Sequence, residues 1–390
     1  MEAKEFQKHL KENLIPFWNR LKDDTYGGFY GFVDENQKID CKSVKGVILM
    51  SRILWFYSKA YMLCEDDELL KMANHVYAFL AEYCYDKQYG GMYWSVNYDG
   101  TPADTTKHAY NQAFAVYALS VYYQAGGNRD ALSLAYTLYH LIEEKCRDRD
   151  GYLEAFHRDF TPASNEKLSE NGVMAGRTMN TLLHVLEAYT ELYRADGLGE
   201  VGDILRWIFR LFREKMFNED KQILDVFFDK EYNSLIDLES YGHDIEASWL
   251  IDRGCQVLGD KGWQDKMEPI IRALAHTTYQ NAYDKTVHAL YNEREADQID
   301  RQKIWWVQAE AVVGFYNAYQ KDLERIEYRQ AAEGIWHFIR ENMVDARSGE
   351  WYESIRADGT RDMGQALVHP WKCPYHNGRM CMEMIERLGR

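Results

Sequence analysis

The chain has 390 residues and a formal net charge of −16, because 62 acidic side chains outnumber 46 Lys and Arg. Nucleic acids and anionic membranes bind basic surfaces, so the charge argues against both as partners. Aromatic residues make up 14 % of the chain, and their flat rings suit either a packed core or the faces of sugars. With only 6 Pro and no linker-like segment, we expect one domain over residues 1–390.

The N-terminal segment predicts a helix. Phe6, Leu10, Leu14 and Trp18 recur every four residues, and no apolar run of signal-peptide length is present. No segment reaches the roughly 20 apolar residues of a membrane span. The 7 cysteines include no CxxC pair, which fits a reducing compartment better than a disulfide framework. We therefore expect a soluble, cytoplasmic protein.

One kind of segment then recurs along the chain: an alternating aromatic stretch, a polar turn and a helical pattern. Alternating aromatics closed by Asp-Gly or Asp-Glu-Asn predict β-hairpins. Six such segments, 60 to 72 residues apart, account for the whole length. They start at Gly27, Gly90, Asp150, Gln222, His288 and Gly349.

Two helices are predicted between successive hairpins. After the first hairpin, Val47, Leu54 and Tyr61 lie on one apolar stripe, and residues 69–83 form a second. Later helices should end at the turn sequences Gly126-Gly127, Asp196-Gly197 and Gly259-Asp260. Six pairs of helices can bury their apolar faces by closing into a ring, so the pattern predicts an all-α (α/α)6 barrel with short β-hairpins on the active-site face. An open solenoid is the competing geometry, but it does not require six units.

Polar clusters follow the hairpins at the same phase of each repeat. Buried polar side chains destabilise a protein unless they are paired or functional, so we expect these clusters to form a site at one mouth of the ring. In chain order they contain Lys45 and Arg52, His108 and Tyr110, Asn180 and His184, His243 and Glu246, Trp306, and finally Trp371 and His376.

Helical spacing places some of these side chains on common faces. Arg177, Asn180 and His184 are spaced i, i+3 and i+7, which predicts one shared face. His243 and Glu246 are spaced i, i+3, so the carboxylate could orient the imidazole or join it in binding a hydroxyl group.

Histidines dominate these clusters, and histidine exchanges protons near neutral pH. Two histidines on opposite faces of a sugar carbon suit removal and return of a proton next to a carbonyl. This favours an aldose epimerase or an aldose–ketose isomerase. The four histidines at matching phase are His108, His184, His243 and His376.

The residues alone do not exclude other functions. Glu187, Glu246 and Glu310 keep glycoside hydrolysis possible, since it needs two opposed carboxylates. A non-catalytic sugar-binding protein is a further alternative. We expect no metal, because His243-x-x-Glu246 is a poor signature and no HExxH or EF-hand motif occurs. We also expect no cofactor, since no nucleotide-binding glycine motif is present.

Four segments carry a resemblance to a known family. The sequence resembles the N-acylglucosamine 2-epimerase superfamily, and within it most resembles the cellobiose 2-epimerases, over essentially the whole chain. The resemblance implies an (α/α)6 barrel, in agreement with the repeat. The segments are R-T-M-N-T-L-L-H from Arg177, Y-G-H-D-I-E from Tyr241, W-W-V-Q-A-E from Trp305 and H-P-W-K-C-P-Y-H-N-G-R from His369.

The resemblance also implies catalytic roles. His243 and His376 would be the acid and base at C2, and the reaction would pass through a cis-enediol. His184 would help to open and close the sugar ring, or hold the C1 oxygen. Arg52 would stabilise the enediolate, because a fixed guanidinium is a strong donor to developing negative charge.

The remaining implied roles concern binding. Tyr110, Asn180 and Glu246 would hold hydroxyl groups and set the imidazole orientation. Trp306 and Trp371 would stack on sugar faces, Trp371 near the non-reducing unit.

The implied activity is cofactor-independent 2-epimerisation of the reducing-end sugar of β-1,4-linked disaccharides such as cellobiose, lactose or mannobiose, acting as a monomer. An aldose–ketose isomerase acting on a monosaccharide such as mannose is the alternative, and a glycoside hydrolase is the weaker one.

Overall fold

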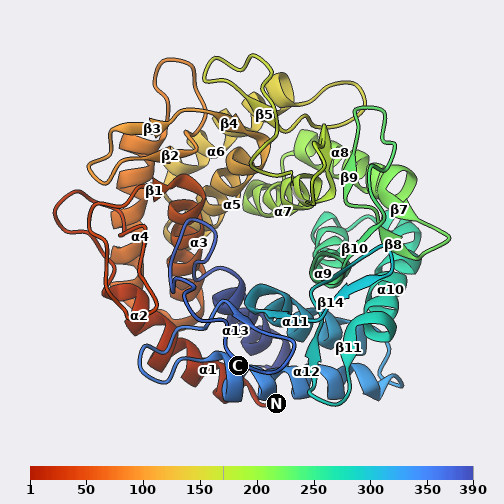
Figure 1. The fold of residues 1–390 in the computed structure, drawn as a ribbon. Helices are drawn as coiled ribbons and strands as arrows, with labels where there is room; N and C mark the ends of the chain where they lie inside the picture. The colour runs from red at the N-terminus through yellow and green to blue at the C-terminus, as the bar shows by residue number, and fades with distance from the viewer. Residues whose placement is uncertain (170, 390) are drawn as a thin grey trace.

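A computed structural model describes residues 1–169 and 171–389, and it shows two concentric rings of helices (Figure 1). The inner ring is formed by α3 (Val47–Cys64), α5 (Ala109–Gly126), α7 (Met179–Asp196), α9 (Tyr241–Leu258), α11 (Trp305–Lys321) and α13 (His376–Leu388). The outer ring is formed by α1 (Ala3–His9) with α2 (Ile15–Asn19), α4 (Asp67–Phe79), α6 (Arg129–Leu141), α8 (Gly199–Leu211), α10 (Lys261–Ala282) and α12 (Ile326–Phe338). The predicted (α/α)6 barrel is confirmed.

The ring closes through the two ends of the chain. Each inner helix contacts the next, and α13 returns to α3. The outer partner of α13 is α1, so the first helix of the chain pairs with the last, and the two termini lie close together (Figure 1). The N-terminal amphipathic segment buries Phe6, Leu10, Leu14 and Trp18 in this position, as its four-residue spacing predicts.

Helix ends follow the local sequence. Three inner helices stop at a left-handed glycine with φ near +70°, at the predicted positions Gly127, Gly197 and Gly259. Several outer helices instead run into a five-residue π turn. These turns are η1 (Leu10–Leu14), η2 (Leu80–Cys84), η3 (Ile142–Cys146), η4 (Phe212–Met216) and η5 (Ile339–Met343).

The predicted hairpins are present and short, and they do more than turn the chain. Most strands that precede an inner helix also pair with the next repeat, for example Lys45 with Val96 and Lys107 with Phe156. The sequence did not indicate this pairing, which joins neighbouring units around the mouth. The sheets are β1 (Lys45–Gly46), β2 (Ser95–Val96), β3 (Pro102–Asp104); β4 (Lys107–His108), β5 (Ala155–Phe156); β6 (Arg177–Thr178), β9 (Phe227–Phe228); β7 (Phe217–Asn218), β8 (Ile223–Leu224); β10 (Leu238–Ser240), β13 (Glu293–Glu295), β14 (Gln298–Asp300); β11 (Tyr283–Asp284), β12 (Ala289–Leu290); and β15 (Lys303–Ile304), β16 (Ser354–Ile355).

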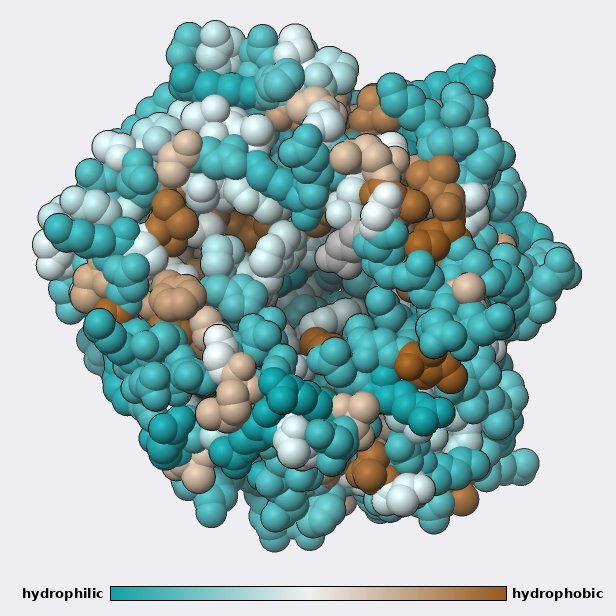
Figure 2. Space-filling view, viewed as in Figure 1, coloured by the Kyte–Doolittle hydropathy of each residue, from teal (hydrophilic) through white to brown (hydrophobic). Residues whose placement is uncertain are grey.

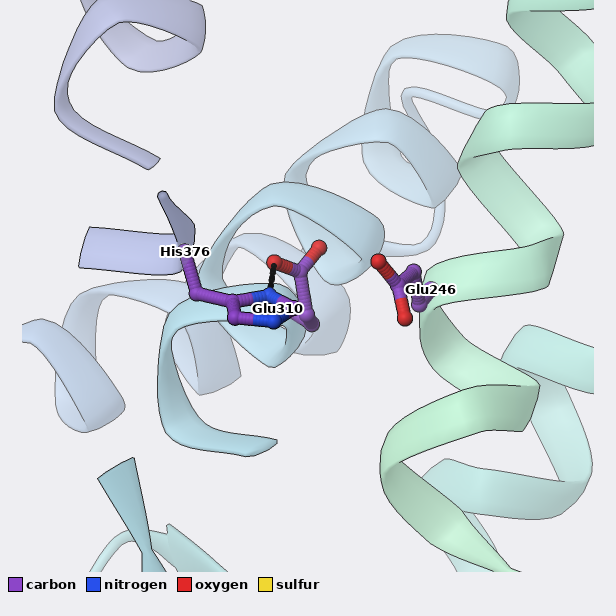
Figure 3. Close-up of side chains that lie close together, drawn as sticks. All are labelled: Glu246, Glu310 and His376. Atoms are coloured by element: carbon purple, nitrogen blue, oxygen red, sulfur yellow. Dashed lines mark hydrogen bonds and ion pairs between the residues drawn. The ribbon is translucent and has the colours of Figure 1, made fainter. Parts of the chain in front are cut away.

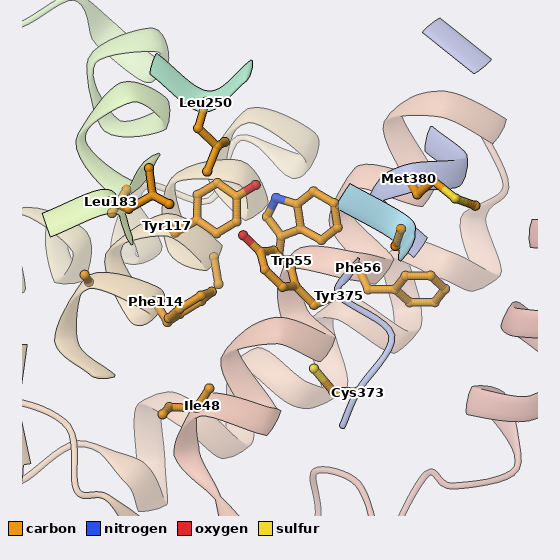
Figure 4. Close-up of a cluster of buried hydrophobic side chains, with 14 of the residues drawn as sticks. Ile48, Trp55, Phe56, Phe114, Tyr117, Leu183, Leu250, Cys373, Tyr375 and Met380 are labelled. Atoms are coloured by element: carbon orange, nitrogen blue, oxygen red, sulfur yellow. The ribbon is translucent and has the colours of Figure 1, made fainter. Parts of the chain in front are cut away.

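Aromatic side chains fill the barrel beneath the mouth (Figure 4). Trp55 stacks on Tyr117 with ring centroids 5.6 Å apart, and Tyr375 meets Trp55 and Phe114 edge-on. Their packing gives the polar groups above them a rigid apolar support. Helix α3 is long and apolar enough to cross a membrane by composition, but 78 % of it is buried inside the protein, as befits an inner helix of the ring.

Candidate active site

A cavity of about 460 Å³ opens at the mouth of the barrel, where Figure 2 shows the molecular face hollowed at the centre of the ring. This volume is in the range typical of small-molecule sites. All nine predicted site residues line it: Arg52, Tyr110, Asn180, His184, His243, Glu246, Trp306, Trp371 and His376.

The repeat explains this convergence. Every inner helix except α13 begins directly after a short strand at the mouth, so the first turns of these helices lie at the cavity. The side chains come from every inner helix: Arg52 from α3, Tyr110 from α5, Asn180 and His184 from α7, His243 and Glu246 from α9, Trp306 from α11 and His376 from α13. Trp371 comes from the segment before α13.

His376 is a neutral imidazole with a fixed orientation. Its Nδ1 lies 2.7 Å from Oε1 of Glu310 (Figure 3). Burial lowers the pKa of His376 well below its usual value, and the charge of Arg379 acts in the same direction. With Nδ1–H donating to Glu310, the Nε2 atom carries a free lone pair and can accept a proton.

His243 is also neutral but has an uncharged partner. Ser240 Oγ lies 2.8 Å from its Nδ1. Burial lowers the pKa of His243 to about 3, with a further contribution from the nearby His184. The prediction that Glu246 orients this imidazole is wrong, because the Glu246 carboxylate turns away to Arg379.

One indole ring contacts both imidazoles. The Trp306 ring centroid is 4.8 Å from that of His243 and 5.6 Å from that of His376. Two neutral bases from α9 and α13 therefore lie next to the same flat apolar surface inside the cavity.

Arg379 links three carboxylates below the histidines. It bonds to Glu187 and Glu246, and its NH2 lies 2.8 Å from Glu310 Oε1. Burial, together with the charge of Glu310, raises the pKa of Glu246 to about 7 against the effect of Arg379. Glu246 Oε2 is buried without a partner, so it remains available to a ligand hydroxyl group.

A divalent ion would find suitable donor types in part of this cluster. Ligand atoms of Glu246, Glu310 and His376 lie within 4.8 Å of one another (Figure 3). The Arg379 guanidinium, however, bonds both carboxylates and already supplies a positive charge between them. This donor set therefore fits the guanidinium better than an additional cation.

Arg52 supplies a fixed cation on the other side of the cavity. Its guanidinium lies 4.3 Å above the Phe114 ring and donates to the Tyr110 hydroxyl at 2.9 Å and to the Trp371 carbonyl at 3.3 Å. Its Nε is buried without a partner, as is Oδ1 of Asn180. These unpaired atoms leave a donor and an acceptor ready for a polar ligand.

The Trp371 loop is anchored by two residues that the sequence analysis did not single out. His369 accepts the backbone N–H of Trp371 at 3.3 Å through Nδ1, and its Nε2 lies 3.1 Å from Glu353 Oε2. Both side chains line the cavity. His369 lies within the H-P-W-K motif, so this motif could have indicated it as a site residue. No sequence pattern indicated Glu353.

Three predicted placements are wrong. Lys45 lies in β1, where its Nζ pairs with Asp23 at 2.7 Å, and it is not among the residues lining the cavity. Arg177 precedes α7 and lies in β6, where it pairs with Asp148 at 2.7 Å, so it does not share the face of Asn180 and His184. His108 is buried 4.7 Å from the Trp94 ring and is not among the residues lining the cavity. Phase in the repeat places a residue near the mouth, but packing decides which way its side chain points.

Comparison with known proteins identifies the family of this chain. The model of the N-acylglucosamine 2-epimerase (GlcNAc 2-epimerase) family matches residues 27–377. The chain belongs to this family.

Relatives within the family are similar along their whole length. The cellobiose 2-epimerase of Eubacterium cellulosolvens is 50 % identical over 396 residues, covering 97 % of each chain. That of Ruminococcus albus is 49 % identical and covers 99 % of each. The crystal structure of a sugar epimerase from a ruminal bacterium superposes with a TM-score of 0.97, at 48 % identity and 99 % coverage of both chains.

Proposed function

We propose that this protein catalyses cofactor-independent 2-epimerisation of the reducing-end sugar of β-1,4-linked disaccharides, converting cellobiose to glucosyl-mannose and acting also on lactose or mannobiose. The similar relatives named cellobiose 2-epimerase support this proposal. The observation that carries it is the pair of neutral imidazoles, His243 and His376, on one indole ring within the cavity.

The proposed reaction starts from the ring-opened sugar. The Nε2 atom of one histidine removes the proton from C2, and the electron pair of the C–H bond forms the C1–C2 double bond of an enediolate. Arg52 stabilises the negative charge on the C1 oxygen. Rotation about C2–C3 presents the opposite face. The first histidine releases its proton to solvent, and the other histidine, His243 or His376, takes a proton from solvent and delivers it to C2. Low pKa values keep both imidazoles neutral at rest, as a base requires.

The remaining cavity residues are assigned to binding. Trp306 would stack on the reducing sugar and Trp371 on the non-reducing one, since indole faces match the C–H faces of pyranoses. Tyr110, Asn180 and Glu246 would hold hydroxyl groups. We further propose that residues 1–390 act as one catalytic domain and that the protein is monomeric and cytoplasmic. Size-exclusion chromatography with light scattering would test the monomeric state.

Incubation of cellobiose with the protein in D2O, followed by NMR, tests the function. We expect glucosyl-mannose with deuterium at C2 of the reducing unit, in the presence of EDTA as well as without it. A ketose product would instead indicate an aldose–ketose isomerase, and release of glucose a hydrolase. Absence of both deuterium at C2 and a new epimer would contradict the proposal.

A further inference from the structure

A carboxylate that does not line the cavity stands directly behind His184. Glu187 is one helical turn further along α7, and its Oε2 lies 2.9 Å from Nδ1 of His184. Both side chains are buried, with relative exposures of 3 and 4 %. The ring is held on its other sides, 5.2 Å from the Tyr110 ring and 4.7 Å from Phe114. His184 therefore presents Nε2 to the cavity in one orientation.

The surroundings of Glu187 keep it ionised. Tyr375 donates its hydroxyl to this carboxylate at 2.5 and 2.6 Å, and Arg379 forms an ion pair with it. Burial opposes ionisation, but Arg379 and His184 outweigh it and lower the pKa of Glu187 to about 2. An ionised carboxylate only accepts hydrogen bonds, so Nδ1 of His184 must carry a proton.

The other two cavity histidines have different partners. His243 faces the uncharged Ser240 hydroxyl. His376 faces Glu310, whose pKa burial raises, although Arg379 acts against this. His184 thus has the partner best suited to stabilise an imidazolium, in the way that the aspartate of a catalytic triad supports its histidine.

We propose that Glu187 is the positioning residue that makes His184 a proton shuttle for ring opening, and that the protein therefore interconverts sugar anomers independently of the chemistry at C2. This inference rests on the proposed sugar substrate. Nε2 of His184 takes the proton of the C1 hydroxyl group, the C1 oxygen forms the carbonyl, and the C1–O5 bond breaks with its electron pair on O5. The imidazolium, paired with Glu187, then returns the proton to O5. Reclosure on either face of the carbonyl gives either anomer.

Anomer interconversion separates this step from C2 chemistry. We expect His243→Ala to lose epimerisation but still accelerate the α-to-β conversion of freshly dissolved α-cellobiose, followed by polarimetry or NMR. Adding Glu187→Gln should slow this conversion at least about 100-fold, because the amide lacks the charge and can impose the other tautomer on His184. Equal rates in the single and double variants, or no acceleration by His243→Ala, would overturn the inference.

Two further variants guard against a merely structural effect. Glu191→Gln, one turn further along α7, removes another buried carboxylate that pairs with Arg253 at 2.8 Å, and it should leave anomer conversion unchanged. Glu187→Asp keeps the charge for Arg379 but withdraws from His184. It should strongly slow anomer conversion while the protein still folds.

In a Glu187→Asp enzyme that still epimerises, the deuterium isotope effect of C2-labelled cellobiose on kcat should fall towards 1, because ring opening limits the rate. An undiminished isotope effect would place Glu187 in another step. If the wild type interconverts anomers without epimerising, the proposed function fails while this inference stands.

Discussion

The two ends of the barrel use buried charge differently. At the mouth, Arg52, Asn180 and Glu246 each keep a buried polar atom without a partner, around a cavity of about 460 Å³. At the opposite end a cavity of about 10 Å³ remains, closed by ion pairs of the side chains Lys59, Glu191, Arg253, Glu383 and Glu386.

Pairing is what distinguishes the two ends. Arg253 lies 2.8 Å from Glu191 and 2.9 Å from Glu383, and none of these three has an unpartnered buried side-chain atom. These three charges at the closed end satisfy one another, whereas Arg52, Asn180 and Glu246 at the mouth leave donors and acceptors for a ligand. Substitutions at the mouth should therefore reduce activity, and substitutions at the closed end should reduce stability.

The largest expected effect is at the mouth. Replacing His243 or His376 with Ala should lower kcat for cellobiose epimerisation at least about 1000-fold, since each removes a base that has no substitute nearby. Thermal unfolding should change little, because removal of a neutral side chain next to the cavity leaves no unpaired charge. Activity within tenfold of the wild type in either variant would remove that histidine from the C2 step.

The closed end should respond in the opposite way. Arg253→Met removes the cation that buried Glu191 and Glu383 share and leaves them only the longer contacts of Arg194 at 3.6 Å and Arg387 at 3.4 Å. Breaking a buried ion pair in this way typically costs about 3–5 kcal/mol in the free energy of unfolding. Urea denaturation measures this loss, and kcat of the folded fraction should remain within about threefold of the wild type. A large loss of kcat with normal stability would show that the two ends are coupled.

A smaller effect is expected at the rim of the cavity. Trp371→Ala removes a ring that lies 5.8 Å from Tyr110 and, in our proposal, stacks on the non-reducing sugar. Stacking of this kind contributes about 1–2 kcal/mol, so KM for cellobiose should rise about tenfold with little change in kcat. An equal loss for free glucose as a poor substrate would argue against a role specific to the second sugar.

The smallest expected effect is on the pH dependence of stability. His243 binds a proton near pH 6.5 when unfolded but only near pH 3 when folded. Between these values the unfolded state binds more protons, so stability falls as pH decreases. From pH 7.5 to 5.5 this group should contribute a loss of about 1.4 kcal/mol. Urea denaturation of the wild type and His243→Asn should show this difference, and parallel pH curves would contradict it.

Much of the fold could be predicted because the repeat is local. Aromatic alternation, Asp-Gly turns and glycine helix ends each act over a few residues. The hairpins and the helix ends at Gly127, Gly197 and Gly259 could therefore be predicted from the sequence. The pairing of strands between neighbouring units was not, because it joins residues about 50 apart, such as Lys45 and Val96.

The site was predictable to a similar depth. Phase in the repeat identified nine of the residues that line the cavity, yet it also selected Lys45, Arg177 and His108, whose side chains point elsewhere. Helical spacing suggested Glu246 as the partner of His243, but Ser240 takes that place. Helical spacing identifies neighbours on one helix. It does not show that a residue of another helix, here Arg379, binds the Glu246 carboxylate instead.

The sequence by itself determined the number of units, the helical class and the set of polar side chains at the mouth, since these depend on periodicity and turn chemistry. Only the tertiary structure decided how α1 closes the ring against α13 and how Arg379 gathers Glu187, Glu246 and Glu310. Those contacts join helices far apart in the chain, and their burial and charge set the partner and proton of each histidine.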